Sequence, residues 1–345
     1  MKTLRRLTTM CLMSVCFILV CWHRAGADVA LQLVSARDHL VGAFTTPATL
    51  YADADRIYLA SALSGQLFVL ARDRAADFPL LEVIEDSTLP LSAVAGDKNH
   101  LYVGATDGNI RVYEKTFPLS LVDTIPIATF RINSIQVLGK DIYIALGFTS
   151  LAVDQKRLYL SELNEGDVVK LLSSERTFGE TFEPNTTMIF DRKKGNLITT
   201  LSNPSGLGGS TVAVDLYSNG KLLIQTAPGC CGTGVSIHNE KTFGLDQTIT
   251  RTAANATVIS SDLLIVGTEL GTVDVFDLKN NPSPILSSAN LRTLTGHTGS
   301  EDIEVRALWA DNVDHLIFAA SSGGNDQSRG PLLPTFFVLE LVRTK

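Results

Sequence analysis

A repeated hairpin pattern constrains the fold of this chain more than any other feature of its sequence. The stretch LYVGATDGNIRVY at residues 101–113 aligns without a gap with LIVGTELGTVDVF at residues 264–276. In both stretches apolar and polar residues alternate on either side of a glycine-centred turn, which is the pattern of two half-buried strands joined in a hairpin. YLASALSGQLFVL at residues 58–70 and IYIAL at residues 142–146 fit the same frame.

The copies recur at a nearly constant interval. The first begins 43 residues before Leu101, the third begins 41 residues after Leu101, and Leu264 follows Leu101 by 163 residues, close to four more steps. This period is typical of a β-propeller blade of four strands. At roughly 45 residues per blade, the chain after residue 27 is long enough for about seven blades. We therefore predict an all-β propeller of about seven four-stranded blades, with six or eight as alternatives. The competing fold, a pair of β-sandwich domains, does not require a fixed recurrence.

Between the clear copies the sequence is less regular. Strand-like segments begin at residues 158 (LYLSEL), 167 (DVVKLL), 196 (NLITTL), 210 (STVAVDL) and 221 (KLLIQT). The segments 173–184 and 321–334 are longer than a hairpin turn requires, and we predict loops there, which are either functional or mobile. In the second loop, Asn325, Asp326 and Arg329 are candidate binding residues at one face of the disc.

Residues 293–322 resemble a WD-repeat. Gly296 and His297 stand where that family has its Gly-His pair, and VRALWAD followed by LIFAASS matches its first two strands. The resemblance implies a structural role for His297, which in the family is hydrogen-bonded to an aspartate of the tight turn, and Asp107 holds that turn position in the second copy. The chain has no Trp-Asp dipeptide and one Gly-His unit. The resemblance therefore implies the wider WD-repeat-like propeller group, whose members are usually binding scaffolds.

The two ends of the domain are predicted to share one blade. Open sheet edges invite aggregation, and a propeller commonly completes one blade with strands from both chain ends. TFFVLELV at residues 335–342 and VALQLV at residues 29–34 have the composition of strands. We therefore expect the two to meet in one sheet. The alternative is that residues 28–45 form a disordered tail.

Residues 1–27 have the zones of a secretory signal peptide. Three basic residues within positions 1–6 precede an apolar run at residues 10–22, and Ala25-Gly26-Ala27 offers small residues for cleavage. The run of 13 residues is shorter than the roughly 20 that a membrane-spanning helix needs. We predict cleavage after Ala27, a single propeller domain over residues 28–345, and a secreted or periplasmic location. An uncleaved anchor is the alternative.

The charge balance argues against nucleic acid as a partner. Loss of the leader removes four basic residues and lowers the formal net charge from −7 to about −11. A chain of this charge repels phosphate backbones and anionic lipid. No other stretch of the sequence is long and apolar enough to span a membrane. The expected partner is a protein or a glycan.

Motifs for catalysis, metals or cofactors are absent from the sequence. The histidines are scattered, and there is neither a nucleophile elbow nor a phosphate-binding loop. Asp53 and Asp55 are not followed by the further oxygen ligands of an EF-hand calcium loop, and we assign them to a turn between two blades. We therefore predict no catalytic residue, no metal and no cofactor.

The adjacent pair Cys230 and Cys231, in the stretch APGCCGTG, is the most unusual local feature. The other three cysteines lie in the leader, so this pair alone remains after cleavage. Disulfides usually join α-carbons about 4.4–6.8 Å apart, whereas sequence neighbours lie about 3.8 Å apart. A bond between the two would close a strained ring, which the flanking glycines accommodate. In an oxidising compartment we predict a vicinal disulfide, with packed thiols, intermolecular pairing and metal capture as alternatives.

Two functions are compatible with these features. The favoured one is a non-catalytic binding scaffold for protein or glycan, with the disc face, Cys230, Cys231 and the segment 325–329 as candidate contacts. The alternative is a propeller enzyme, a quinoprotein-like oxidoreductase or a hydrolase, whose site lies at the central channel beside the two cysteines. Quinone-dependent dehydrogenases with a vicinal disulfide carry tryptophan-rich docking repeats, and this chain has only two tryptophans.

Overall fold

The computed structural model of the protein is almost entirely β-structure. It describes residues 29–37, 47–61, 65–85, 90–127, 132–138, 141–146, 150–154, 157–161, 168–173, 176–181, 186–191, 197–202, 215–218, 221–226, 234–239, 241–250, 254–280, 282–296, 304–321 and 335–343. Within these ranges the one helix is the short α2 (Leu291–Leu294), and no helix there is long and apolar enough to cross a membrane.

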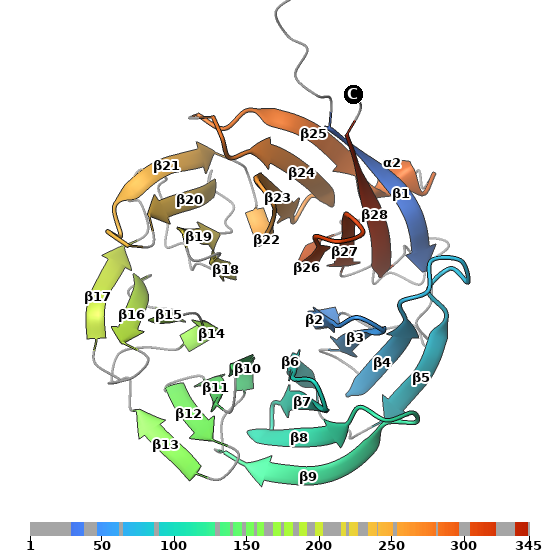
Figure 1. The fold of residues 1–345 in the computed structure, drawn as a ribbon, viewed down its shortest axis with the longest axis vertical. Coiled ribbons are helices and arrows are strands. Elements are labelled where there is room, and N and C mark those ends of the chain that lie inside the picture. The colour runs from blue at the N-terminus through green and yellow to red at the C-terminus, as the bar shows by residue number, and fades with distance from the viewer. Residues whose placement is uncertain are drawn as a thin grey trace, which may run out of the picture.

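The described strands form seven four-stranded antiparallel sheets, which are arranged as blades around a common centre (Figure 1). Blade 1 contains β2 (Pro47–Ala52), β3 (Arg56–Ser61), β4 (Gln66–Ala71) and β5 (Leu80–Glu85). Blade 2 contains β6 (Leu91–Gly96), β7 (His100–Ala105), β8 (Asn109–Glu114) and β9 (Ser120–Pro126). Blade 3 contains β10 (Ile132–Leu138), β11 (Asp141–Leu146), β12 (Ser150–Asp154) and β13 (Arg157–Ser161).

The remaining blades follow in chain order. Blade 4 contains β14 (Val168–Ser173), β15 (Arg176–Thr181), β16 (Thr186–Asp191) and β17 (Leu197–Ser202). Blade 5 contains β18 (Asp215–Ser218), β19 (Leu222–Thr226), β20 (Gly234–Asn239) and β21 (Leu245–Thr250). Blade 6 contains β22 (Ala254–Ser260), β23 (Leu263–Thr268), β24 (Thr272–Asp277) and β25 (Ile285–Asn290). Blade 7 contains β26 (Val305–Asp311), β27 (Leu316–Ser321), β28 (Phe336–Arg343) and β1 (Val29–Arg37).

The predicted hairpin repeat coincides with the middle strands of the blades. The aligned stretches become the pairs β3–β4, β7–β8 and β23–β24, and IYIAL lies in β11. One predicted loop is wrong, because the segment 173–184 contains β15, which pairs with both β14 and β16. Threonine and phenylalanine favour strands, but the charged residues Arg176 and Glu180 obscure the alternation in RTFGET.

Strands from both ends of the domain close the ring, as predicted. β1 pairs antiparallel with β28 in a register that sets Val29 opposite Arg343 and Leu31 opposite Leu341. Val29 and Leu31 are buried in an apolar cluster that reaches into blade 6. Figure 1 shows the first and last strands side by side at the outer side of blade 7. Burial of these side chains holds the two ends together.

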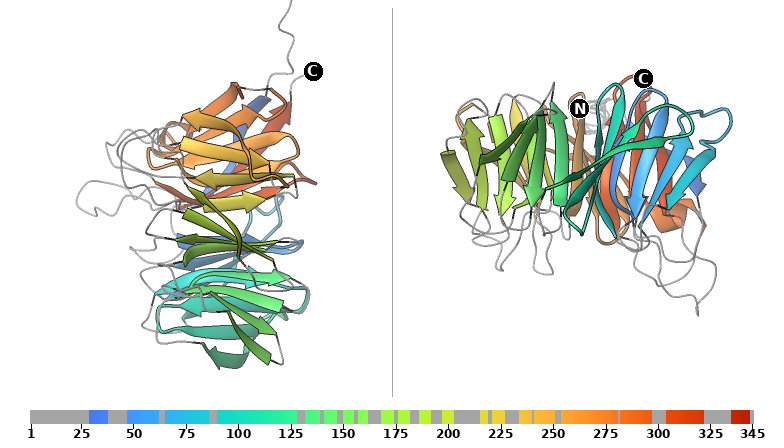
Figure 2. Two further views of the ribbon diagram at one scale, coloured as in Figure 1. Left: turned by 90° about the vertical axis from the view of Figure 1, so that its left-hand side faces the viewer. Right: turned by 90° about the horizontal axis from the view of Figure 1, so that it is seen from below.

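The strands run through the thickness of the disc, as the edge-on views show (Figure 2). Antiparallel neighbours therefore place their turns alternately on the two faces. The turn between the first and second strand of a blade lies on the same face as the turn between its third and fourth strand. We call this face the polar face, because the ion pairs between blades that are described below lie on it.

Two glycines of the repeat allow neighbouring blades to approach closely. Gly104 and Gly267 hold the same position in the two aligned stretches. A Cβ atom added to Gly104 would lie 2.7 Å from Cγ2 of Ile132 in blade 3. A Cβ atom added to Gly267 would collide with Val305 in blade 7. The glycines are thus required by the contact with the next inner strand.

We expect Gly267→Ala to lower the free energy of unfolding by about 1–3 kcal/mol, as overpacking of a filled core does. Val305 is fully buried and β-branched, so it has little freedom to turn away. Urea denaturation measures the loss. The double variant Gly267→Ala/Val305→Ala should be more stable than the sum of the two single losses predicts. Additive losses would contradict the contact.

A buried aromatic residue anchors the turn between β4 and β5 at the junction of blades 1 and 7. Phe78 is fully buried although it lies in a turn. Its ring lies edge-on to Phe318 of β27, with centroids 6.1 Å apart. It belongs to a cluster that also contains Leu50 of blade 1 and Phe336 of blade 7. The side chain of this one turn residue therefore helps to join the first blade to the last.

Candidate interaction site

Aspartates in the first turn of blades 1 and 2 organise the polar face. Oδ1 of Asp53 accepts hydrogen bonds from the backbone N–H groups of Asp55, at 3.1 Å, and Arg56, at 2.9 Å. Asp97 accepts the corresponding bonds in blade 2, both at 2.7 Å. The turn of Asp53 and Asp55 joins β2 to β3 within one blade, so its assignment to a connection between blades is wrong. Aspartate stabilises either kind of turn by the same hydrogen bonds, and sequence does not separate them.

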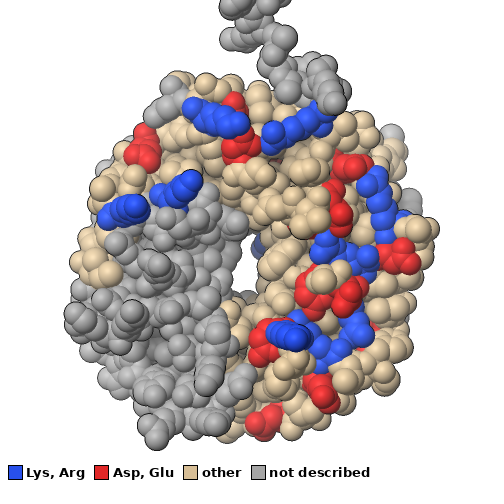
Figure 3. Space-filling model, viewed as in Figure 1, with Lys and Arg blue, Asp and Glu red and all other residues tan. Residues whose placement is uncertain are grey.

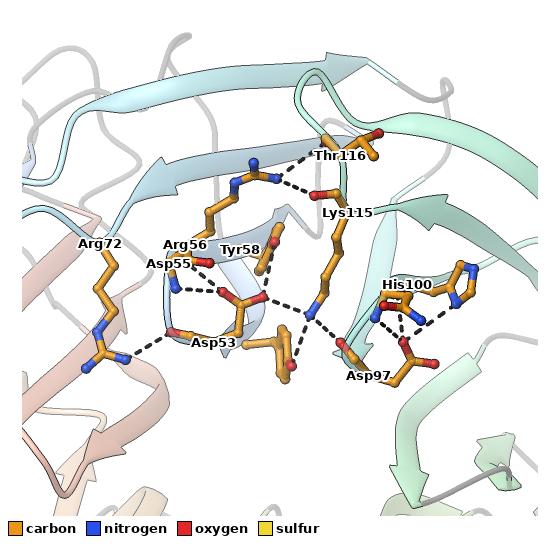
Figure 4. A network of polar contacts seen from close by, with 11 residues as sticks. Asp53, Asp55, Arg56, Tyr58, Arg72, Asp97, His100, Lys115 and Thr116 are labelled. Carbon is orange, nitrogen blue, oxygen red and sulfur yellow. Dashed lines mark hydrogen bonds and ion pairs between the residues drawn. The ribbon is translucent and has the colours of Figure 1, made fainter.

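Lys115 joins blade 2 to blade 1. It is the first residue after β8, and its ammonium donates to Oδ2 of Asp53 at 2.8 Å, to the carbonyl of Asp97 at 2.7 Å and to the hydroxyl of Tyr51 at 3.2 Å. These three bonds use all three of its donors. Only 9% of the Lys115 side chain is exposed. Figure 4 shows the ammonium between the two blades, with Asp53 on one side and Asp97 on the other.

Aromatic rings support this ammonium. Tyr51 and Tyr58 stack with centroids 5.8 Å apart, and Lys115 lies 4.7 Å and 5.6 Å from their centroids. Trp309 of blade 7 meets the Tyr51 ring edge-on at 5.4 Å. A cation over an aromatic face is stabilised by the ring quadrupole. The lysine is therefore held by rings as well as by oxygens.

The charge of Asp53 is stabilised in the folded state. Burial alone would raise the pKa of Asp53, but the hydrogen bond and charge of Lys115, with the two turn N–H groups, lower it below its ordinary value. The Tyr58 hydroxyl donates to Oδ2 of Asp53 at 3.3 Å. Burial, and then the charge of Asp53, raise the pKa of Tyr58 above its ordinary value. The floor of the site thus combines the ionised carboxylate of Asp53 with the neutral phenol of Tyr58, beside the side chains of Lys115 and Tyr51.

A hollow of about 440 Å³ lies above this floor, between blades 1 and 2. Its lining combines the floor with residues from the two first turns, and the complete set is Tyr51, Asp53, Ala54, Asp55, Arg56, Tyr58, Asp97, Lys98 and Lys115. Arg56 donates to the carbonyl of Lys115 at 2.9 Å, and its guanidinium lies 5.6 Å from the centroid of Phe117. On the face in Figure 3, cationic and anionic atoms are interspersed on the described blades, without a broad area of one sign.

The junction of blades 7 and 1 repeats this construction. Arg72 is the first residue after β4, and it donates to the Asp311 carboxylate of the preceding blade and to the carbonyl of Asp53 in its own blade, at 2.9 Å. Lys115 makes the same two contacts one blade further on, with Asp53 and Asp97. Arg72 also bonds Asp314 at 3.0 Å. Basic residues at equivalent positions thus join two successive pairs of blades.

A third ion pair joins blade 7 to blade 6. Arg343, at the end of β28, donates to Oδ1 of Asp262 at 2.8 Å, and Lys279 contacts the same carboxylate. The hydrogen bond from Lys279, opposed in part by burial, and then the contact with Arg343 hold the pKa of Asp262 at about 2. The closing blade is therefore tied by ion pairs to both of its neighbours.

The low pKa of Asp262 predicts an acid-sensitive contribution to stability. The unfolded chain binds this proton near pH 3.9, so between about pH 4 and pH 2 the unfolded state holds more protons than the folded state. The contribution is complete above pH 4 and is lost as the pH falls toward 2. The unfolding temperature, measured from pH 2 to pH 6, should fall less steeply with falling pH for Asp262→Asn than for the wild type. Parallel curves would contradict the assignment.

Solved structures share this arrangement of four-stranded blades. The chain is similar to Chaetomium thermophilum Raptor (TM-score 0.71, 12% identity, 91% of this chain and 29% of that one). It is also similar to the WD40 propeller domain of Doa1 (TM-score 0.67, 14% identity, 90% and 96% of the chains). The fold is a WD40-like β-propeller.

The computationally designed protein Ika8 is a further structural neighbour of this propeller, with a TM-score of 0.62 and 14% identity over 90% of this chain and 99% of that one. The propeller spans less than a third of the length of the Raptor chain, of which it covers 29%. No protein-family model and no curated protein matches the sequence. At these identities the likeness establishes the fold of the propeller.

Two of the site residues that the sequence predicted, Asp107 and Gly296, lie within the described ranges. Asp107 lies in the β7–β8 turn, where it accepts from the N–H of Asn109 at 3.0 Å and pairs with Arg111 at 2.9 Å. Gly296 follows α2 with a φ of +72°, a conformation that glycine adopts without strain. The other predicted site residues lie outside the described ranges: Cys230, Cys231, His297, Asn325, Asp326 and Arg329.

Sequence reasoning missed the residues that form the hollow. Asp53 was noticed only as part of an acidic turn, and Lys115, Arg56, Tyr51 and Lys98 were not singled out. One sequence signal was available, because Asp53-x4-Tyr58 and Asp97-x4-Tyr102 repeat the same spacing and each tyrosine donates to its aspartate. Within the described ranges, no group of three or more histidine, cysteine, aspartate or glutamate residues is arranged to hold a metal ion.

Proposed function

We propose that this protein is an exported, non-catalytic interaction scaffold that binds a protein partner on its polar face. The observation that carries the proposal is the combination of a hollow whose floor has internally paired charges with exposed apolar groups on the same face. Phe117 is 57% exposed next to Arg56, and Val313, in the first turn of blade 7, is 83% exposed. Arginine and aromatic residues are enriched at the energetic centres of protein interfaces.

The residues at the floor of the hollow are better suited to binding than to catalysis. Lys115 is hydrogen-bonded through every donor, and the Asp53 carboxylate accepts from Lys115 and Tyr58 as well as from two N–H groups. A general base or nucleophile needs an available lone pair within reach of a substrate. Here those groups join two blades and fix the backbone of the two turns that carry the rim residues, which lowers the entropy lost on binding. WD40-like propellers typically bind proteins, which agrees with this assignment.

The leader supports the proposed location outside the cytoplasm. If residues 1–27 are removed during export, the propeller meets its partner in the periplasm or outside the cell. Mass spectrometry of the purified protein tests this directly, with an expected N-terminus at Asp28. An N-terminus at Met1 would contradict the proposed cleavage and support a retained anchor.

Site-specific photocrosslinking tests the binding face. A photoreactive amino acid replaces Asp55 or Lys98 on the polar face, and Leu270 in a separate variant, in cells that produce the protein. Leu270 is 60% exposed in the β23–β24 turn, which lies on the opposite face. We expect crosslinks to a protein from positions 55 and 98 but not from 270. Crosslinks from position 270 alone, or a glycan as the sole captured ligand, would contradict the proposal.

A further inference from the structure

Two equivalent junctions on the polar face differ in their basic residue, which is an arginine in one and a lysine in the other. Arg72 and Lys115 occupy the same position after the third strand of blades 1 and 2, and each contacts its own first turn and the preceding one. A guanidinium is a wide planar fork, whereas an ammonium is a compact charge. The lysine junction is the one that contains the hollow of about 440 Å³.

The two walls of this hollow each contribute a cation. Arg56 comes from blade 1 and Lys98 from blade 2, and neither forms an ion pair within the described part of the chain. The Tyr51 hydroxyl accepts from Lys115, which leaves its own hydrogen available to donate. Residues with hydrogen-bond donors on both walls and on the floor therefore line one space.

The carboxylates around the hollow differ in whether they already have an ion-pair or hydrogen-bond partner. Asp53 is paired with Lys115, and Asp97 accepts from two turn N–H groups and from Tyr102. Asp55 is exposed at the rim, without an ion pair in the described ranges. Arg56 and Lys98 thus face two carboxylates, Asp55 and Asp97, of which only Asp55 accepts no hydrogen bond on its side chain within the described ranges.

We propose that the hollow is the anchor pocket for an acidic side chain, aspartate or glutamate, of the protein partner. This inference rests on the proposed function and specifies the chemistry of its binding site. The entering carboxylate accepts hydrogen bonds from Arg56, Lys98 and the Tyr51 hydroxyl. The volume of the hollow lies within the usual range for ligand pockets, about 300–1,000 Å³, so the hollow admits the acidic side chain and the backbone that carries it. Phe117, which lies against Arg56, provides an apolar contact for the flanking segment.

The sign of the effect at Asp55 separates an acidic guest from a basic one. Asp55 repels a bound carboxylate, so Asp55→Asn should tighten binding about two- to threefold, as expected for an exposed charge. A lysine or arginine guest would instead be attracted by Asp55, and the same substitution would weaken its binding. Lys98→Ala should weaken binding of an acidic guest by a similar factor. Both residues are exposed, so neither variant endangers the fold.

Lys115→Arg tests the pocket itself. The longer side chain keeps the charge beside Asp53 but occupies the hollow, as Arg72 occupies the preceding junction. We expect binding to weaken by roughly tenfold or more, because the guest loses its space. Lys241→Ala, an exposed lysine of the β20–β21 turn on the same face, is the matched control and should leave binding unchanged. Thermal unfolding of each variant confirms that the fold is retained.

A displayed library of random twelve-residue peptides supplies the probe. Peptides are selected on the immobilised mature protein, and the affinities of synthetic copies are measured for the wild type and the variants. Selected peptides that contain an acidic residue, lose affinity for Lys115→Arg and gain affinity for Asp55→Asn support the inference. It is overturned if no selected peptide depends on Lys115, or if Asp55→Asn weakens binding. In that case crosslinks from positions 55 and 98 would still support the proposed function, whereas their absence would remove it as well.

Discussion

Arg72→Ala is expected to lower the free energy of unfolding by about 3–5 kcal/mol, the loss that follows when one partner of a buried ion pair is removed. Only 13% of the Arg72 side chain and 8% of the Asp311 side chain are exposed. The substitution leaves the Asp311 carboxylate buried without its cation. It also removes the bond to the carbonyl of Asp53, which holds Arg72 against the first turn of its own blade. Denaturation in urea measures the change.

Two further variants define the cause of this loss. Arg74→Ala removes the neighbouring ion pair with Glu340, in which 53% of the Arg74 side chain is exposed, and should lower the free energy of unfolding far less, because solvent screens an exposed pair. The double variant Arg72→Leu/Asp311→Leu removes both buried charges and should recover much of the stability, because no unpaired charge remains. Equal losses for Arg72→Ala and Arg74→Ala would show that the Asp311 contact is not buried as described.

Phe78→Ala should be comparably destabilising, by about 3–5 kcal/mol, because it empties a space that a fully buried ring fills. The cavity would lie among Phe318, Phe336 and Leu50, where both blades are already fixed by their own sheets and relax little. Phe117→Ala is the matched control. The same side chain is 57% exposed there, and its loss should cost at most about 1 kcal/mol. A similar loss for the two variants would contradict the anchoring role of Phe78.

The fold was predictable because its signals are local. Alternation with a period of two is visible within one hairpin, and the recurrence of LYVGATDGNIRVY as LIVGTELGTVDVF gave the blade and its length. The pairing of β1 with β28 was predictable from a general requirement, since a ring must close. β15 was missed, because a strand in which charged and polar residues predominate lacks the apolar alternation on which sequence reasoning depends.

The hollow was not predictable by the same means. Lys115 lies 62 residues after Asp53 in the chain, and their contact depends on how far successive blades are rotated about the common axis. A lysine after a strand and an aspartate in a turn are each ordinary surface residues when read alone. The shared spacing of aspartate and tyrosine in the first two blades indicates a repeated turn, but it does not indicate which cation from the next blade reaches it.

The pairing of the first strand with the last has a consequence for the order of folding. Val29 is among the first residues of the domain to be synthesised, and its partner Arg343 is among the last. Until β28 has formed, β1 lacks the strand that it pairs with in the described sheet, and an unpaired strand is competent to join other chains. Contacts between residues so distant in sequence form slowly. The ring can therefore close only after synthesis of the whole domain, and its first strand needs protection until then.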